Sequence, residues 1–270
     1  MKTSDHEHKT WVGQVFDRTA AEYGMQSTSF FQYFGKRLVE QVPIVPGQHS
    51  LDVATGKGAI LFPLAEQITP QGKVVGIDIS EQMLAETAVI AQKKGMDWVE
   101  LLPMDAEHLH FPNHSFDHLF CGFALFFFPS LSKALAEFKR VLKPGGTLAV
   151  STWGEDSELD ALVHGEIQQF VNTPSLILNP LWSSEVLYQA LDEAGLNNIR
   201  IIEETEEFIY PTPEEWWNSL WSLATRAKLE CLSPQQLALL RARLMEKAIQ
   251  LDKGQGLIEN LQVFYGIAKK

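Results

Sequence analysis

A turn of small residues follows the first strongly apolar segment of the chain, in the run Leu51-Asp52-Val53-Ala54-Thr55-Gly56-Lys57-Gly58. Small residues at positions 54, 56 and 58 let a ligand approach the backbone closely. A strand-to-helix turn also points N–H groups toward an anionic or polar ligand. A tight turn without a ligand has the same composition, because glycine also serves where the backbone adopts unusual angles. The turn is therefore a candidate binding site that needs a second residue to support it.

That second residue is Asp78, which ends the next predicted strand, 20 residues after Gly58. A carboxylate at this distance can accept both hydroxyl hydrogens of a ribose, although Asp78 could equally cap the helix that follows. Together, the turn and Asp78 predict a ligand that contains adenosine. A nicotinamide dehydrogenase is an alternative, but its G-x-G-x-x-G pattern requires a third glycine where this chain has Leu61.

The overall charge argues against nucleic acid as a partner. With 22 basic and 34 acidic residues, the formal net charge is −12, which repels a phosphate backbone. The two cysteines, Cys121 and Cys231, are too few for a disulfide framework, and the charged first nine residues do not form a signal peptide. The longest apolar run, 119–128, is half of the roughly 20 residues that cross a bilayer as a helix. We therefore expect a cytoplasmic protein with no membrane span.

The elements that position these residues alternate between strand and helix patterns, which is typical of an α/β fold. Apolar runs predict strands at 50–54, 73–79, 98–102, 116–123, 147–152, 199–210 and 262–268. Helices are expected at 81–94 and at about 185–194. Two further segments, 10–42 and 211–256, have helical apolar patterns. In the second, the capping boxes Thr212–Glu215 and Ser233–Gln236 each start a helix.

Four further segments give the chain a family resemblance. They are Val15-Phe16-Asp17-Arg18-Thr19-Ala20-Ala21-Glu22-Tyr23, Pro103-Met104-Asp105-Ala106-Glu107, Ser115-Phe116-Asp117-His118 and Arg140-Val141-Leu142-Lys143-Pro144-Gly145-Gly146-Thr147-Leu148. With the turn, where Ala54 replaces the first glycine of the pattern, they resemble class I S-adenosylmethionine-dependent methyltransferases. The resemblance covers about residues 10–210. It is closest to the ubiquinone/menaquinone-biosynthesis C-methyltransferase-like group, of the methyltransferase domain 11 type.

The resemblance implies a doubly wound, seven-stranded, mostly parallel sheet whose last strand is antiparallel. It suggests an N-terminal helical cap over 1–45 and an S-adenosylmethionine-binding core over 46–210. A helical lid insertion would follow over 211–256, and a final core strand over 257–270. The cofactor is expected across the carboxyl ends of the first and fourth strands.

The resemblance also assigns cofactor contacts residue by residue. The turn would hold the methionine part, Asp78 the ribose, and Asp105 and Ala106 the adenine. The full expected set is Tyr23, Asp52, Ala54, Thr55, Gly56, Gly58, Asp78, Ile79, Met83, Asp105, Ala106 and Phe123. Met83 also fits simple core packing, and Asp105 also fits an ordinary turn residue.

The methyl acceptor is expected to be a small and largely apolar molecule. The segment after the fourth strand, 123–129, is wholly apolar, and aromatic residues recur in both helical segments. Candidate acceptor contacts are Phe127, Phe128, Trp153, Trp216 and Trp217, beside a cluster of Phe30, Phe31 and Phe34. Aromatic stripes of this kind also occur as ordinary core. The N/D-P-P-Y motif of methyltransferases that act on nucleic-acid amines is absent from the sequence.

A general base is the hardest residue to assign. His164 and Tyr23 are the two candidates, although Tyr23 by resemblance contacts the carboxylate of the cofactor. His108, His110 and His114 are evenly spaced around a predicted loop, but they lack the H-E-x-x-H arrangement, so we expect no metal site.

These observations predict methyl transfer from S-adenosyl-L-methionine to a small apolar metabolite, with oxygen or carbon as the favoured acceptor atom. A polyprenyl-quinone precursor and secondary metabolites are both open as acceptors. One alternative is a non-catalytic protein that binds the same cofactor and uses its helices as an interaction surface. The other is the nicotinamide dehydrogenase. The sequence does not define the oligomeric state.

Overall fold

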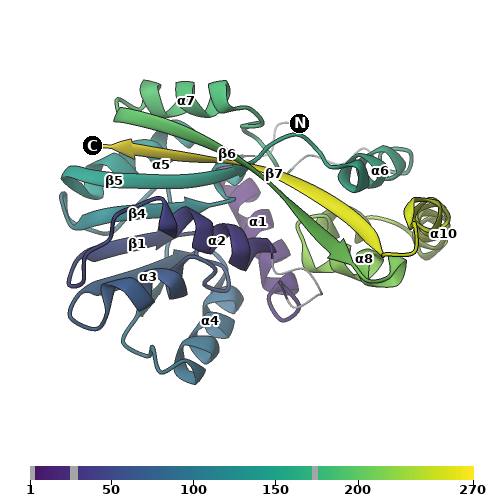
Figure 1. Ribbon diagram of the computed structural model, residues 1–270, viewed down its shortest axis with the longest axis horizontal. Helices are drawn as coiled ribbons and strands as arrows, with labels where there is room; N and C mark the ends of the chain where they lie inside the picture. Colours follow the sequence, from purple (N-terminus) through teal and green to yellow (C-terminus); the bar gives the residue numbers. More distant parts are fainter. Residues whose placement is uncertain (1–3, 25–29, 172–175) are drawn as a thin grey trace.

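Seven strands pair into one sheet in the order β3-β2-β1-β4-β5-β7-β6 (Figure 1). They are β1 (His49–Val53), β2 (Lys73–Asp78), β3 (Glu100–Pro103), β4 (Phe116–Gly122), β5 (Leu142–Trp153), β6 (Asn197–Tyr210) and β7 (Leu257–Lys269). This computed structural model describes residues 4–24, 30–171 and 176–270. Strands β1 to β5 pair in parallel, whereas β7 is antiparallel to both β5 and β6. The predicted α/β class and the antiparallel last strand are confirmed.

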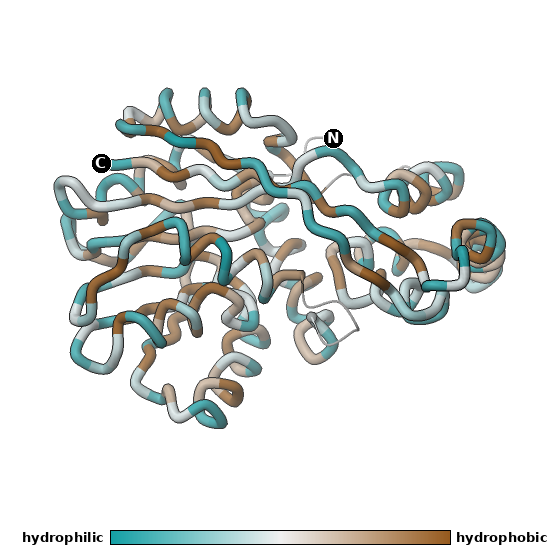
Figure 2. Tube along the Cα trace, viewed as in Figure 1, coloured by the Kyte–Doolittle hydropathy of each residue, from teal (hydrophilic) through white to brown (hydrophobic). Residues whose placement is uncertain are grey.

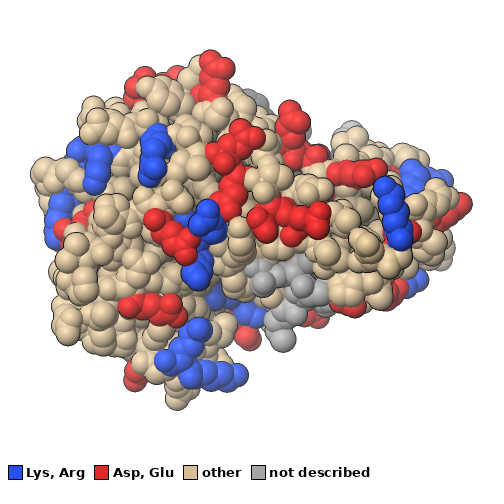
Figure 3. Space-filling model, in the orientation of Figure 1, with Lys and Arg blue, Asp and Glu red and all other residues tan. Residues whose placement is uncertain are grey.

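Strands β6 and β7 form a long hairpin-like pair at one edge of the sheet. They pair from Asn197 with Lys269 to Tyr210 with Leu257, and their far end extends past the other strands (Figure 1). Exposed and partly buried residues alternate along β6, as expected for an edge strand with one solvated face, and hydrophilic and hydrophobic colours alternate there in Figure 2. Acidic side chains gather along this pair (Figure 3), and β6 alone carries Glu203, Glu204, Glu206 and Glu207.

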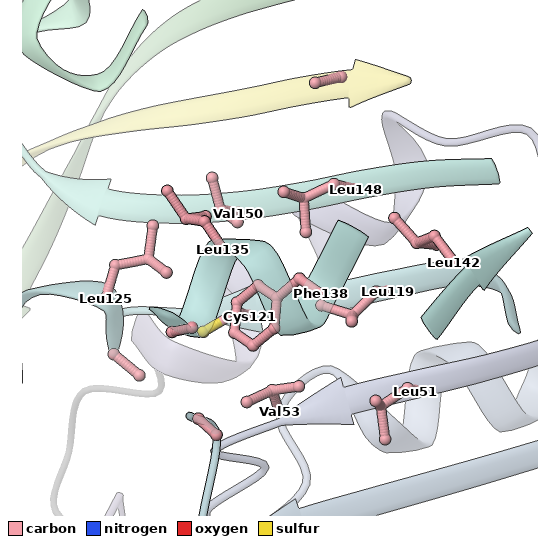
Figure 4. Close-up of a cluster of buried hydrophobic side chains, with 14 of the residues drawn as sticks. Leu51, Val53, Leu119, Cys121, Leu125, Leu135, Phe138, Leu142, Leu148 and Val150 are labelled. Atoms are coloured by element: carbon pink, nitrogen blue, oxygen red, sulfur yellow. The ribbon is translucent and has the colours of Figure 1, made fainter. Parts of the chain in front are cut away.

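Helices cover both faces of the sheet. One face carries α2 (Phe30–Glu40), α3 (Leu61–Ile68) and α4 (Glu81–Lys93), and the other carries α5 (Leu131–Val141) and α7 (Ser184–Glu193). Figure 4 shows Leu135 and Phe138 of α5 against Leu119 and Cys121 of β4 and Val150 of β5. Burial of each Leu or Phe side chain stabilises the folded protein by roughly 1.5–3 kcal/mol relative to leaving it exposed. This core fixes the carboxyl ends of β1 and β4, where the site is built.

The far end of the β6–β7 pair carries a second group of helices, which we call the lid after the segment predicted at 211–256, although α6 of this group precedes that segment. It contains α6 (Glu158–Ile167), α8 (Pro213–Ser219), α9 (Arg226–Leu229) and α10 (Pro234–Leu251). Ser233 caps α10 with both bonds of a capping box, and the Thr212 hydroxyl accepts from the Glu215 N–H at 3.1 Å. The sequence did not predict α6, whose Leu159 and Val163 pack into the core of the lid.

Helix α1 (Asp5–Thr19) connects the lid to the sheet. The Ser80 hydroxyl, at the end of β2, donates to Asp17 of α1 at 2.6 Å. Arg18 of the same helix forms an ion pair of 2.8 Å with Glu230, just after α9. The helix therefore spans from the carboxyl ends of the strands to the lid.

Two strands begin five residues earlier than the sequence predicted. Strand β5 begins at Leu142, because a shift in the register between Phe116 and His118 lets β4 pair across the Pro144-Gly145-Gly146 turn. Strand β7 begins at Leu257, since its first residues pair with β6 outside the main sheet. Within the described ranges, no helix combines the length and the apolar character that crossing a membrane requires.

Candidate active site

The turn after β1 has a backbone conformation that few residues tolerate. Ala54, Gly56 and Gly58 have φ angles of +55°, +50° and +80°. A Cβ at Gly58 would overlap the ring of Phe62, so a side chain there would also force that ring to move. A positive φ costs a non-glycine residue roughly 1–2 kcal/mol. Strain of this kind is characteristic of functional sites.

Replacing Ala54 with glycine is expected to stabilise the protein. Glycine removes the strain of the positive φ but adds backbone entropy to the unfolded chain, so the net gain is about 0.5–1 kcal/mol. Thermal or urea unfolding measures it. The control is Ala59→Gly, in the same turn without a positive φ, which is expected to lower the free energy of unfolding. A loss of stability in both variants would contradict the strain at Ala54.

Two side chains support the turn from beneath. The Thr55 hydroxyl donates to Oδ2 of Asp52 at 2.6 Å, while Oδ1 of Asp52 is buried and has no hydrogen-bond partner among the described residues. Burial raises the pKa of Asp52 to about 7, against the opposing effect of the Thr55 hydrogen bond. The backbone of Leu61 opposes the shift in the same direction as Thr55, so Asp52 is a buried acid that supports the turn.

Asp78 faces the same turn from the end of β2. Its Oδ2 accepts from the Gly56 N–H at 2.8 Å and its Oδ1 from the Ser80 N–H at 2.9 Å. Burial raises the pKa of Asp78 to about 6, although these backbone hydrogen bonds oppose the shift. Because each carboxylate oxygen can accept two hydrogen bonds, the group can still accept two hydroxyl hydrogens.

A cavity, termed the first cavity, opens above these groups. Of the expected cofactor residues, its lining contains Tyr23, Ala54, Gly56, Asp78, Ile79, Met83, Asp105, Ala106 and Phe123. Asp52, Thr55 and Gly58 are absent from the lining and support the turn instead. Lys9, Val12 and Phe16 of α1 close one side.

Asp105 forms an ion pair with a lysine of α1. Lys9 donates to Asp105 at 2.8 Å and to the buried Glu107 at 2.7 Å. Burial tends to raise the pKa of Asp105, but the Lys9, Glu107 N–H and His108 hydrogen bonds outweigh it and hold the pKa below its usual value. The sequence did not predict the contact with Lys9.

Tyr23 lies at the boundary of the first cavity, where its ring stacks on Phe31 at 4.9 Å. Burial raises the pKa of its hydroxyl, and the charge of Asp78 adds to that effect. Tyr23 is therefore a neutral hydrogen-bonding group at physiological pH rather than a base.

A second cavity of about 170 Å³ adjoins the first. Four aromatic side chains line both cavities: Phe16, Tyr23, Phe123 and Phe127. Phe123 stacks on Trp153 at 4.0 Å and has a φ of +52°, so its backbone is strained as at Ala54. The two cavities thus meet at an aromatic boundary at the carboxyl end of β4.

The lining of the second cavity includes His164 of α6. Nδ1 of His164 lies 2.9 Å from Oδ2 of Asp156. A carboxylate partner favours the tautomer with the proton on Nδ1, which leaves the lone pair of Nε2 free to accept a proton. The side chain of His164 is 38% exposed, so it can reach a molecule in the cavity.

The other residues that were expected to contact the acceptor do not all line the second cavity. Trp153, Trp216 and Phe127 line the second cavity, together with Phe30 and Phe31. Phe128 lines only the first cavity. Trp217 lines neither, because it packs into the core of the lid, and Phe34 is likewise buried in the core beside α3. No cluster of three metal-ligating side chains is found in the part of the chain that the structure describes.

The first cavity fits a nucleoside that carries a positive charge. Asp78 lines this cavity, keeps lone pairs that can accept from hydroxyl groups, and as an acid favours a nearby cation. The sheet order and this lining are those expected of a class I S-adenosylmethionine-dependent methyltransferase. The family model described as the ubiE/COQ5 methyltransferase family matches residues 2–159, and the chain belongs to that family. Its cofactor is S-adenosyl-L-methionine.

Similar proteins have related activities. Nocamycin O-methyltransferase of Saccharothrix syringae is 30% identical over 247 residues, covering 86% of this chain and 88% of that protein. Aklanonic acid methyltransferase DauC of Streptomyces sp. (strain C5) is 37% identical over 148 residues, covering 55% and 67% of the two chains. The structure of Haemonchus contortus phosphoethanolamine N-methyltransferase 2 with S-adenosyl-L-methionine shares the fold, with a TM-score of 0.57 and 20% identity over 88% of this chain and 52% of that one. These relationships do not favour the dehydrogenase or the non-catalytic alternative.

Proposed function

We propose that this enzyme methylates a hydroxyl oxygen of a small, largely apolar molecule bound in the second cavity. The observation that carries the proposal is the junction of the two cavities at four aromatic side chains, with His164 and its partner Asp156 in the lining of the second. Nocamycin O-methyltransferase, which aligns along 86% of this chain, is named for methylation of oxygen, and this supports oxygen as the acceptor atom.

In this proposal the first cavity holds the cofactor. S-adenosylmethionine supplies an electrophilic methyl group on a sulfonium sulfur. Asp78 accepts the ribose hydroxyls, Asp105 and Ala106 contact the adenine, and the strained turn holds the methionine part. Asp78, an acid in the lining of this cavity, also attracts the positive charge.

The aromatic boundary has two tasks in the reaction. Phe123 and Trp153 form a rigid stacked wall against which an apolar acceptor can lie, and well-oriented reactants gain effective molarities of about 10⁵–10⁸ M. Phe16 and Phe127, 5.4 Å apart between ring centroids, help to exclude bulk water. Exclusion of water strengthens the electrostatic interactions of the site.

Proton removal is assigned to His164. Nε2 accepts the proton of the acceptor hydroxyl while Asp156 holds Nδ1–H and stabilises the resulting imidazolium. Of the two bases that the sequence suggested, we propose His164 rather than Tyr23. The raised pKa of Tyr23 keeps its hydroxyl protonated, and a neutral hydroxyl is a poor base.

The test is incubation of the purified enzyme with S-adenosylmethionine and a panel of naphthols, alkylphenols and quinols. We expect formation of S-adenosylhomocysteine to depend on the phenol, and product NMR to show an O-methyl ether. A methyl group on a ring carbon would contradict oxygen as the acceptor atom. Turnover with carboxylates or amines, but with no hydroxyl compound, would contradict the proposal as a whole.

A further inference from the structure

The second cavity contains two carboxyl groups that the proposed methyl transfer does not use. Asp160 of α6 and Glu259 of β7 both line it, and neither lines the first cavity. Oγ of Ser157 lies between them, 3.0 Å from Asp160 Oδ2 and 3.1 Å from Glu259 Oε1. The Tyr210 hydroxyl donates to the other oxygen of Glu259 at 2.8 Å. These contacts fix the two carboxyl groups beside each other.

Among the described residues, no lysine or arginine forms an ion pair with either acid. The main charge effects on the pKa of Asp160 come from His164, which lowers it, and from Asp156, which raises it, whereas Asp160 raises the pKa of Glu259. Burial is the main cause that raises the pKa of both groups. Lys228 of α9 interacts with Asp156, and burial lowers its own pKa. Burying two ionised acids without a lysine or arginine partner is unfavourable, unless a proton or a bound cation offsets the charge.

The Ser157 hydroxyl has too few hydrogens to donate to two ionised carboxyl groups. The hydroxyl of Ser157 has one hydrogen, which cannot be donated to both carboxyl groups at once. Without a ligand, one of the two carboxyl groups must therefore hold a proton of its own, and a ligand that brings a positively charged donor can displace that proton. The cavity has the space for such a ligand, because it is the larger of the two cavities.

The rest of the lining is suited to a positive charge. Trp153, Trp182 and Trp216 line the cavity, and aromatic faces attract cations. Glu155 and Asp156 add two more acids, and no lysine or arginine lines the cavity among the residues described. A carboxylate in this environment would be repelled.

We propose that the second cavity selects acceptors that carry a protonated amine, held at Asp160 and Glu259 while the reacting hydroxyl lies toward Phe123. The ammonium group supplies a cation to a cavity whose described lining has no lysine or arginine, and it donates to carboxylate oxygens that otherwise share the one hydrogen of the Ser157 hydroxyl. This inference rests on the proposed function, since it takes the second cavity as the acceptor site. It adds that a basic nitrogen, on the part of the acceptor away from the hydroxyl, determines the affinity.

Three phenols of similar size test the proposal: tyramine, 4-ethylphenol and 3-(4-hydroxyphenyl)propionate. Their binding is measured at pH 7 by calorimetry and by quenching of tryptophan fluorescence, with no turnover required. We expect tyramine to bind at least about tenfold more tightly than 4-ethylphenol, and the propionate to bind more weakly than both. Tyramine should also release part of a proton from the carboxyl pair, seen as a binding enthalpy that depends on the ionisation enthalpy of the buffer.

Two variants test whether Asp160 and Glu259 cause the preference for tyramine. Glu259→Gln and Asp160→Asn should each reduce the preference for tyramine to within about threefold. The control Glu207→Gln makes the same charge change on the exposed face of β6 and should keep the preference. Equal affinity for the three phenols, or a preference that survives both cavity variants, would overturn the amine site and leave the proposed function standing. Failure of all three phenols to bind would overturn both.

Discussion

Replacing Asp78 with asparagine is expected to weaken the binding of S-adenosylmethionine at least 100-fold. The carboxylate accepts from two backbone N–H groups and keeps lone pairs for two ribose hydroxyls. The amide NH₂ of asparagine would face a donor where the carboxylate offered an acceptor. Hydrogen bonds to charged groups contribute about 1.5–3 kcal/mol each, so the loss of two exceeds about 3 kcal/mol. Calorimetric titration with the cofactor measures the change.

Thermal unfolding of the Asp78→Asn variant distinguishes a loss of cofactor affinity from misfolding. The pKa of Asp78 is raised in the folded protein to about 6, so above pH 6 the ionised group lowers stability relative to a neutral side chain. We therefore expect the asparagine variant to unfold at a temperature no lower than the wild type at pH 8. In the wild type, affinity should fall as the pH drops below about 6, because protonated Asp78 attracts the cofactor less. Glu81→Gln, an exposed neighbour, is the matched control, and an Asp78→Asn affinity within threefold of the wild type would refute the role.

Replacing His164 with glutamine is expected to lower kcat on a phenolic acceptor 100-fold or more while cofactor affinity stays unchanged. General bases contribute about 10²–10⁴ in rate. His164 lines only the second cavity, so its loss leaves the first cavity intact. Asp156→Asn should have a smaller effect in the same direction, because it removes the partner that holds the proton on Nδ1. Steady-state kinetics and calorimetry measure the two quantities separately.

The pH profile gives this prediction a further test. The defect of the glutamine variant should shrink as the pH rises toward about 10, where a phenol loses its proton to solvent without a base. His110→Gln, an exposed histidine outside both cavities, serves as the control. A variant that keeps wild-type kcat at pH 7, or a defect that does not change with pH, would remove His164 from the proton transfer.

Local patterns predicted the parts of the fold and site that depend on neighbouring residues. The turn from Ala54 to Gly58 and Asp78 each follow a strand directly, so the strand pattern also placed these residues at one edge of the sheet. The strand starts at Leu142 and Leu257 were missed because pairing partners far along the chain extend both strands. The division into cap, core and lid stays a prediction.

Contacts between distant segments could not be predicted from the sequence. Helix α6 joins a lid whose other helices begin about 50 residues later, so no local signal connects Asp160 with Glu259. Trp216 and Trp217 are adjacent on α8, and a helix turns by about 100° per residue, so only one of them faces the second cavity. Lys9 likewise reaches Asp105 across 96 positions of sequence.

A crystal structure of the enzyme with S-adenosylhomocysteine is the most direct test of the account. We expect the ribose hydroxyls against Asp78 and the sulfur directed at the boundary formed by Phe16, Tyr23, Phe123 and Phe127. A nucleoside bound elsewhere, or a sulfur directed away from the second cavity, would contradict the assignment of the two cavities to donor and acceptor.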